Sequence, residues 1–502
     1  MRGWVAGFLV GCEVADLDVV EPDPEGGTDT AGAIADTGDS AEPAESVDCS
    51  ALPSLPLARP RSLGTFTNGE DFAFDGEGQH VSVDDQGNLM GITLDGVRRV
   101  LYPGLGTVAG VHLLADGTLV YADVLNNTIV NLDYATGDYR VIASGLSYPN
   151  GLDVGRDGFV YVAETGRGGV RRIDPVTGES TVIALGLSAP NGVSFGVGWD
   201  DLYVGSFGGG VGYHLHREAD DTWTRPEVRA IAPEATPPVD PCDGVPIGTT
   251  CPTSYYAVAG QCVVSELGYD VCETVVDTLA CVGLASGDAC ETDLAGVPLG
   301  SICVESPASG ELFCPAAPAE LVEVCGGRVG GPCAVPSGGT GTCVQTYEGA
   351  PLCYETLTDY SAYTEPCEGV ELGAGCIVAD WAYPVVGSCS DGAPYGIAVN
   401  LCLPGNAMGG QFGELDGINV DQCGNIYATA YVAGQVFRWG PAGEGPEIVL
   451  DLRSAWIPNL HWGNGVGGWE KDILYLADRD RGTVYPLEVG VEGHGEAYEP
   501  AP

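Results

Sequence analysis

Residues 149–164 read PNGLDVGRDGFVYVAE and hold the clearest structural signal in the chain. An Asn-Gly pair opens a first strand, residues 156–158 read Arg-Asp-Gly, and branched and aromatic residues fill the strand that follows. Gly and Asp favour tight turns, whereas Val, Tyr and Phe favour strands. The stretch therefore predicts two antiparallel strands joined by a short turn.

The same pattern recurs along the chain at intervals of about 40 residues, the length of a propeller blade. Each unit continues into a third short strand, such as residues 169–174, and a further turn. The first strands of six units begin at Glu70, Ala109, Asn150, Asn191, Asp416 and Asn459. The repeats predict an all-β protein with a six-bladed β-propeller, its blades one to four in residues 49–231 and its blades five and six in residues 409–493.

Residues 232–408 lie between the fourth and fifth predicted blades and form a cysteine-rich insert. Units of about 40 residues bury too little apolar surface to fold unaided, so we predict two disulfides inside each of four cysteine groups. Metal sites are the alternative use of dense cysteines, although the insert has no C-x-x-C pair and no histidine. The groups are Cys242, Cys251, Cys262 and Cys272; Cys281, Cys290, Cys303 and Cys314; Cys325, Cys333, Cys343 and Cys353; and Cys367, Cys376, Cys389 and Cys402.

The 19 cysteines favour export to an oxidising compartment. Cys12 ends the run MRGWVAGFLVGC, which resembles a bacterial lipobox whose cysteine is lipidated, so residues 1–12 are predicted to be a lipoprotein signal. A cytosolic N-terminus with an accidental cysteine is the alternative. Cys49 and Cys423 lie outside the insert, and we expect them to pair with each other. Two buried free thiols are the other possibility.

The charge balance limits the partners. With 19 basic and 70 acidic side chains, the formal net charge is −51. We expect no nucleic-acid partner, because phosphate binding needs clustered Lys and Arg. Residues 13–48 carry acidic but no basic side chains and too little apolar surface to fold, so we predict a disordered acidic tether there, and residues 494–502 form a tail.

The first residues of the repeats carry the chemical prediction. Inner strands of a propeller converge on its axis, so equivalent residues at their starts should face one another across a narrow channel. Two carboxylates among amides would repel each other there unless a cation joins them, and Ca²⁺ or another divalent cation takes such oxygen ligands. Ordinary Asn-Gly and Asp-Gly turns between blades are the alternative. The candidate ring contains Glu70, Ala109, Asn150, Asn191, Asp416 and Asn459.

At these motifs the chain resembles the SMP-30/gluconolactonase/LRE-like six-bladed propellers. The resemblance covers residues 63–231 and 409–493. It implies that Glu70, Asn191 and Asp416 are divalent-metal ligands and that Asn150 lies close to the metal and the substrate. In that family the metal polarises a lactone carbonyl and stabilises the oxyanion formed on hydrolysis. The resembling motifs are Gly69-Glu70, Pro149-Asn150-Gly151, Pro190-Asn191-Gly192 and Leu415-Asp416-Gly417.

The chain departs from related propellers at two positions. Ala109 stands where paraoxonase-type enzymes carry a catalytic histidine, and His112 aligns instead with Asp153, so His112 is expected to be a strand residue. Residues 146–149 replace the substrate-binding arginine of the family. The missing arginine leaves sugar-lactone specificity open.

Asp123 and Glu164 end the second strands of blades two and three and are candidates for a general base. Solvated carboxylates at the rim are the alternative. His214 and His216 alternate on one predicted strand, where they are either metal ligands or surface residues.

Two functions from different classes fit these observations. One is an exported, lipid-anchored, Ca²⁺-dependent hydrolase of lactones or related esters. The other is a non-catalytic surface binding module that calcium stabilises. We expect a lipoprotein of the bacterial outer membrane or cell surface, attached to the membrane only through its lipid, with the periplasm as the alternative location.

Overall fold

The computed structural model describes Cys49, almost all of residues 52–273, separate segments within residues 279–404, and almost all of residues 415–495. Cys12, the predicted tether at residues 13–48 and residues 496–502 lie outside the described residues. Among the helices that are described, none is long and apolar enough to cross a membrane.

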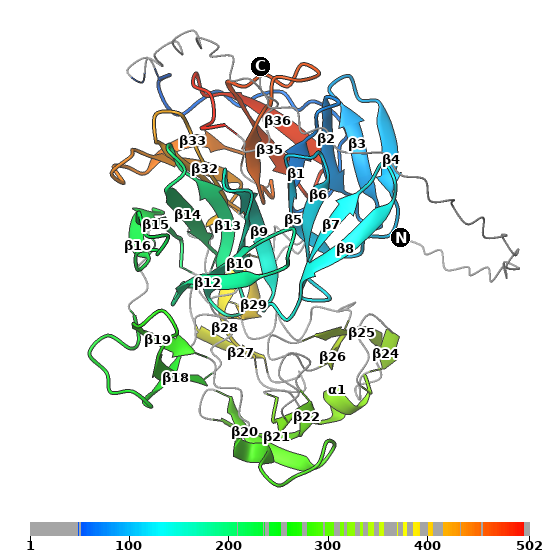
Figure 1. Cartoon of the computed structure of the whole chain (residues 1–502), viewed down its shortest axis with the longest axis vertical. Coiled ribbons are helices and arrows are strands. Elements are labelled where there is room, and N and C mark those ends of the chain that lie inside the picture. Colours follow the sequence, from blue (N-terminus) through cyan, green and yellow to red (C-terminus); the bar gives the residue numbers. More distant parts are fainter. Residues whose placement is uncertain are drawn as a thin grey trace, which may run out of the picture. The chain divides into compact units, whose positions relative to one another are not determined.

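The propeller consists of antiparallel sheets whose strands follow one another in chain order (Figure 1). Short polar turns join strands rich in branched and aromatic residues, as the sequence pattern predicts. The first three blades contain β1 (Phe72–Phe74), β2 (Gln79–Val83), β3 (Leu89–Thr93) and β4 (Arg98–Tyr102); β5 (Val108–Leu113), β6 (Leu119–Asp123), β7 (Thr128–Asp133) and β8 (Asp138–Ala143); and β9 (Pro149–Val154), β10 (Val160–Glu164), β11 (Gly169–Ile173) and β12 (Ser180–Leu185).

Blades four and five have four strands each, and blade six has three strands within its described residues. They contain β13 (Pro190–Phe195), β14 (Asp201–Ser206), β15 (Val211–His216) and β16 (Glu227–Ile231); β30 (Leu415–Val420), β31 (Ile426–Ala430), β32 (Gln435–Trp439) and β33 (Glu447–Asp451); and β34 (Leu460–Trp462), β35 (Ile473–Asp478) and β36 (Thr483–Glu488).

Apolar side chains cluster between every pair of neighbouring blades. The inner strands β1, β5, β9, β13, β30 and β34 contact one another in that order, so β30 follows β13 although the insert separates them in sequence. A further cluster joins blade six to blade one through Phe72, Phe74, Trp469 and Tyr475. Each blade therefore packs on two neighbours, which closes the ring and confirms the predicted six-bladed propeller.

The chain before blade one completes this closure. The backbone N–H groups of Leu63 and Phe66 donate to the carbonyls of Val484 (2.9 Å) and Gly482 (2.6 Å). This segment therefore runs along the edge of β36, on the outer side of blade six. Both ends of the propeller chain thus contribute backbone hydrogen bonds to one blade.

The segment further upstream is attached to blade five. The Leu57 N–H donates to the Val449 carbonyl at 2.8 Å. Cys49 forms a disulfide with Cys423, the pair expected from the sequence, with 5.7 Å between the Cα atoms. A covalent bond therefore holds the incoming chain against the propeller.

The described residues of the insert form small sheets and two short helices. Its elements are β17 (Thr250–Pro252), β18 (Ala259–Val264), β19 (Asp270–Glu273), η1 (Leu279–Cys281), β20 (Ala289–Leu294), β21 (Val297–Ile302), β22 (Val304–Glu305), β23 (Leu312–Phe313), α1 (Ala319–Glu323), β24 (Pro332–Ala334), β25 (Thr340–Gln345), β26 (Pro351–Glu355), β27 (Gly375–Val378), β28 (Val385–Asp391) and β29 (Asn400–Pro404).

The described disulfides of the insert stay within their cysteine groups. In three groups the first cysteine pairs with the third and the second with the fourth, which confirms the predicted confinement for those groups. The pairs are Cys242–Cys262, Cys251–Cys272, Cys281–Cys303, Cys290–Cys314, Cys325–Cys343 and Cys333–Cys353. The fourth group, from Cys367 to Cys402, lies outside the residues whose side chains are described.

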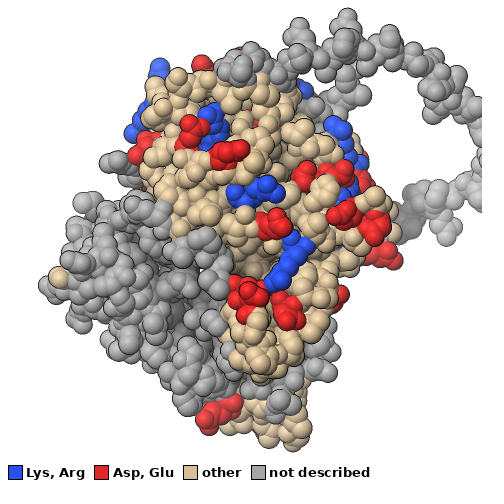
Figure 2. All heavy atoms as spheres, turned by 90° about the vertical axis from the view of Figure 1, so that its left-hand side faces the viewer, with Lys and Arg blue, Asp and Glu red and all other residues tan. Residues whose placement is uncertain are grey.

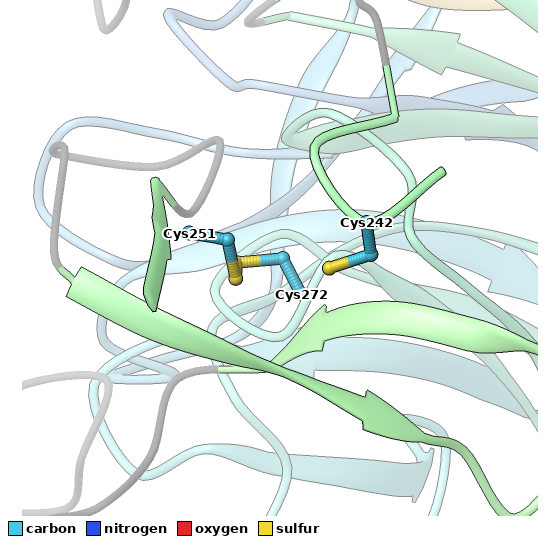
Figure 3. Close-up of side chains that lie close together, drawn as sticks. All are labelled: Cys242, Cys251 and Cys272. Atoms are coloured by element: carbon cyan, nitrogen blue, oxygen red, sulfur yellow. A yellow bond between two sulfur atoms is a disulfide. The ribbon is translucent and has the colours of Figure 1, made fainter. Parts of the chain in front are cut away.

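The sulfur atoms of Cys242, Cys251 and Cys272 lie within 4.8 Å of one another (Figure 3). Each belongs to a disulfide, Cys242 with Cys262 and Cys251 with Cys272. Metal binding by cysteine uses the thiolate, which a disulfide sulfur is not. This cluster is therefore the covalent core of a small unit and not a metal site.

Acidic and basic side chains are interspersed on the face shown in Figure 2. The ion pairs on the propeller include Arg172 with Asp157 and Asp221, and Arg217 with Asp157 and Asp200. On the described part of this face the basic side chains lie beside acidic ones and form no separate basic patch.

Candidate metal site

The candidate ring is built where the inner strands approach one another most closely. A Cβ atom on Gly151 would lie 2.5 Å from the backbone oxygen of Asn191, and one on Gly192 would lie 2.5 Å from that of Asp416. Gly110 stands in the same relation to Asn150. Only glycine permits this approach. The glycines after the ring residues therefore let successive blades meet, and they place Asn150, Asn191 and Asp416 in one layer.

The backbone at the ring is bulged and strained. The pairing of inner and second strands shifts register at the ring position in four blades: in β5, β9, β13 and β30. Tyr148 and Ala189, which precede the two Pro-Asn-Gly motifs, have φ angles of 51° and 44°. Bulges redirect side chains, and such strained residues concentrate at functional sites. The Asn-Gly motifs are thus more than connecting turns.

The ring side chains are shielded from solvent. Asn150 is 7% exposed, Asn191 6% and Asp416 2%, and the Glu70 side chain is 17% exposed. Burial raises the pKa of the Glu70 carboxyl, the nearby charge of Arg479 lowers it, and Asp71 raises it further. Gly151 adjoins the backbone of Asn191 and Gly192 that of Asp416, while the charges of Glu70 and Asp416 both act on Arg479. The four residues therefore lie in one region of the propeller, and their binding of a metal stays a prediction.

Sequence reasoning missed Arg479, which directly follows β35. Its Nη1 atom forms an ion pair with Oε2 of Glu70 and lies 3.5 Å from the hydroxyl of Tyr431. Burial works against the charged guanidinium, but Glu70, Tyr431 and Asp416 outweigh it and raise the pKa of Arg479 above its ordinary value. Aligning the second-strand ends of the blades would have placed an arginine here.

A divalent cation suits this donor set. Two carboxylates and two amides supply the oxygen ligands that Ca²⁺ takes in proteins. Arg479 supplies one positive charge against the two negative charges of Glu70 and Asp416, so the ring retains a net negative charge. The residues present therefore fit a hard divalent cation that would bind Glu70, Asn191 and Asp416, with Asn150 beside it.

A second buried polar layer lies further along the inner strands. His112 Nε2 is 3.2 Å from Asp153 Oδ1, and His461 Nε2 is 2.9 Å from Asp71 Oδ1. His112, on β5, is a buried strand residue, as expected from its alignment with Asp153. Asp71 and His461 were not singled out from the sequence, because their spacing from the ring residues differs from that in blades two to five.

The two candidates for a general base hold loops in place. Asp123, 8% exposed, accepts hydrogen bonds from the backbone N–H (3.1 Å) and side-chain amide (2.7 Å) of Asn126. Glu164, 1% exposed, pairs with Arg171 at 2.9 Å and accepts a bond from the Ser147 N–H at 3.0 Å. Both carboxylates are thus buried and bonded, and Glu164 fixes the loop that leads to Asn150.

His214 and His216 share one carboxylate. His214 Nε2 lies 2.7 Å and His216 Nδ1 2.9 Å from Asp201 Oδ1. Arg229 lies 3.2 Å from the other ring nitrogen of His214. A metal-bound imidazole directs its second nitrogen at an acceptor, and a guanidinium offers only donors. The cluster therefore favours a hydrogen-bonded surface network over a metal site.

The insert joins the propeller on the side that carries the ring. The chain leaves blade four at the end of β16 and returns at Leu415, next to Asp416. The first insert unit packs on blade three, where the Tyr269 hydroxyl accepts a hydrogen bond from the Leu185 N–H at 3.0 Å. Val271 packs there against Val182 and Leu185. The first disulfide unit therefore packs on β12, the strand that precedes β13 and its ring residue Asn191.

A family model described as the SMP-30/Gluconolactonase/LRE-like region matches residues 64–208. No curated protein matches the chain. The similar solved structures include a putative gluconolactonase, 13% identical with a TM-score of 0.42 over 88% of this chain and 94% of its own. A luciferin-regenerating enzyme is 10% identical with a TM-score of 0.43 over 89% of this chain and 100% of its own.

The calcium-binding protein regucalcin from Agrobacterium tumefaciens str. C58 is 12% identical with a TM-score of 0.40 over 88% of this chain and 99% of its own. The chain therefore contains an SMP-30/gluconolactonase/LRE-like region, built into a six-bladed β-propeller with a disulfide-rich insert.

Proposed function

We propose that the protein is an exported, lipid-anchored hydrolase of lactones or related esters that depends on Ca²⁺ or another divalent cation. The observation that carries this proposal is the burial of Asn150, Asn191 and Asp416 at the starts of three inner strands, with Glu70 two residues before the fourth, β1. A cation held there would polarise the substrate carbonyl and stabilise the oxyanion that hydrolysis forms.

The chain's own residues would bind and orient. Asn150 offers an amide beside the carboxylates, in a position to hold the substrate. Glu164 bonds the Ser147 N–H and so fixes the loop before Asn150. We assign Asp123 and Glu164 to this positioning of loops, since the contacts of both carboxylates are with neighbouring residues of their own blades.

A calcium-stabilised binding module is the second candidate, and one observation favours it. The insert enters and leaves beside the ring, and its first unit packs against blade three. An insert that covered the ring would make the cation structural and would itself present the binding surface. Fold does not decide between the two functions, because propellers support both.

Hydrolysis of a panel of lactones and esters, measured with Ca²⁺ and with a chelator, tests the proposal. We expect turnover that needs the cation and that Asp416→Asn abolishes, because the ring then loses a ligand charge. Asp472→Asn, at an exposed position of blade six, is the matched control and should keep the activity. Calcium binding without turnover of any substrate would instead support the binding module.

The lipid anchor is a separate part of the proposal. Cys12→Ser removes the thiol that the lipid would modify, so the variant should leave the membrane fraction and appear as a soluble exported protein. Cys12→Ser protein that stays with membranes as the wild type does would contradict the anchor.

A further inference from the structure

We propose that the ring and the adjoining Arg479 form a site for two ions. In this site a divalent cation binds Glu70 and Asp416, and a small carboxylate binds Arg479. This inference rests on the proposed function, since it concerns the same ring. It adds a ligand class, an organic carboxylate, and a recognition residue that the family motifs do not contain.

Arg479 binds a carboxylate that the divalent cation would also need as a ligand. Its guanidinium pairs with the Glu70 carboxylate and lies in the field of Asp416. A divalent cation needs the same carboxylate oxygens, and two cations repel each other strongly in a buried site. A cation bound to Glu70 must therefore displace Arg479 from it.

Once displaced, Arg479 needs a new partner. Its guanidinium is partly buried and would lose the carboxylate of Glu70 to the cation. A charge left unpaired in a partly buried place is costly. A monovalent anion would replace the lost carboxylate.

The surroundings of Arg479 suit a carboxylate on an apolar body. Its side chain is 42% exposed, so the guanidinium can turn toward solvent while its stem stays anchored. The backbone N–H of Arg479 donates to the Trp456 carbonyl at 2.9 Å. The Trp456 ring lies 5.5 Å from that of Tyr431, which lies 6.2 Å from Phe207.

These aromatic residues stand at related places in the fold. Phe207 and Tyr431 directly follow β14 and β31, as Arg479 follows β35. The rings of Phe207, Tyr431 and Trp456 are partly exposed, so apolar ring surface lies near the Arg479 guanidinium. A guanidinium binds a carboxylate through two parallel N–H···O bonds, and the ring faces would contact the rest of the ligand.

The proposal predicts positive coupling between the two ligands. A carboxylate on Arg479 holds it away from Glu70, and a cation on Glu70 frees Arg479 for the carboxylate. The carboxylate should therefore tighten cation binding and the cation should tighten carboxylate binding by the same factor. Typical couplings are about 5-fold to 150-fold. Lactone and ester hydrolysis releases a carboxylate, so the acid product of the proposed reaction belongs to the class that would bind here.

Calorimetric titration of the full chain with CaCl₂, in buffer alone and in saturating phenylacetate, tests this coupling. We expect the Kd for Ca²⁺ to fall at least fivefold with phenylacetate and less with acetate, which lacks the aromatic body. Arg479→Gln should bind Ca²⁺ more tightly than the wild type in buffer alone, and phenylacetate should then change its Kd by less than twofold. Arg481→Gln is the matched control, because Arg481 pairs with Asp478 at 2.8 Å, and its coupling should equal that of the wild type.

Calcium binding that phenylacetate leaves unchanged in the wild type would overturn the two-ion site and leave the proposed hydrolase intact. Equal coupling in Arg479→Gln and the wild type would overturn the role of Arg479. A wild type that binds no Ca²⁺ would overturn the proposed cation dependence together with this inference. The wild-type titration alone decides the coupling if a variant does not fold.

Discussion

The propeller and the cysteine-rich insert are stabilised in different ways. In the propeller, an apolar cluster fills every interface between neighbouring blades, with large side chains such as Trp439, Trp469 and Tyr161 fully buried. Among the insert residues whose burial is described, few apolar side chains are buried, and the most buried residues include Cys242, Cys262, Cys303 and Cys325. Covalent bonds there replace the apolar area that a larger domain would bury.

This difference explains where a metal site can be built. Ligands must be held within a fraction of an ångström, which rigid elements achieve better than loops. The ring residues lie on inner strands that pack against neighbours on both sides, and glycines let the strands approach closely. The insert offers small, separately bonded units beside this ring, which suits recognition more than ligand geometry.

The largest expected effect comes from breaking the packing between blades six and one. Trp469 is fully buried, contacts Phe74 and Tyr475, and donates from Nε1 to the Gly78 carbonyl at 3.0 Å. Trp469→Ala should lower the free energy of unfolding by about 3–5 kcal/mol, as measured by denaturant titration of tryptophan fluorescence and circular dichroism.

Hydrogen exchange should show that loss in the propeller and not in the insert. Val282→Ala, at a position of the insert that is 74% exposed, is the control and should change stability very little. Equal loss of protection in both regions after Trp469→Ala would show that the two regions do not differ in the way described.

A somewhat smaller effect is expected from removing one disulfide of the insert. Replacing Cys251 and Cys272 by Ser should destabilise the first unit by about 2–4 kcal/mol, because its unfolded chain gains freedom and little apolar burial remains. Local hydrogen exchange should rise between residues 242 and 273 while the blades keep their protection.

The same exchange at Cys49 and Cys423 is the contrasting variant. Their disulfide joins the incoming chain to blade five, so its loss should raise exchange near the closure of the propeller and not in the insert. Identical exchange maps for the two double variants would refute independent stabilisation of the two regions.

Acid should weaken the propeller alone. His80 is fully buried among Phe66, Phe72 and Trp469, and burial lowers its pKa from about 6.5 to about 3. The unfolded state then binds a proton more readily, so propeller stability is complete above pH 6.5 and falls by about 1.4 kcal/mol per pH unit from there toward pH 3.

His80→Leu should reduce this slope in denaturant titrations between pH 7 and pH 4. His216→Leu, an exposed position where a hydrogen bond to Asp201 raises the pKa, should not reduce it. An unchanged slope in His80→Leu would mean that another group causes the acid sensitivity.

The blade pattern was predictable from the sequence because each blade repeats its own local signals. Turns such as Arg156-Asp157-Gly158 and strands such as residues 159–164 recur in each repeat, so each repeat predicts a blade by itself. The equal places of Asn150, Asn191 and Asp416 in their inner strands were predictable for the same reason. Pairing within cysteine groups followed from the group spacing, but the pairing order did not.

Apart from the Cys49–Cys423 disulfide, the features formed between distant segments were not predictable. The segment from Leu63 to Phe66 adds to blade six through backbone hydrogen bonds, which leave no side-chain signal. Arg479 reaches Glu70 across 409 positions of the chain, so their pairing depends on ring closure. His461 meets Asp71 across the same interface.

Calcium titration followed by scanning calorimetry tests most directly whether the ring holds a divalent cation. The Tm of the wild type should rise with Ca²⁺ and fall again with a chelator, because a ligand that binds only the folded state stabilises it. Asp416→Asn and Glu70→Gln keep the shape of the ring but remove a charge, so each should lose most of this shift. A wild-type Tm that does not respond to Ca²⁺ would contradict the metal site. A Tm shift in both variants as large as that of the wild type would contradict it as well.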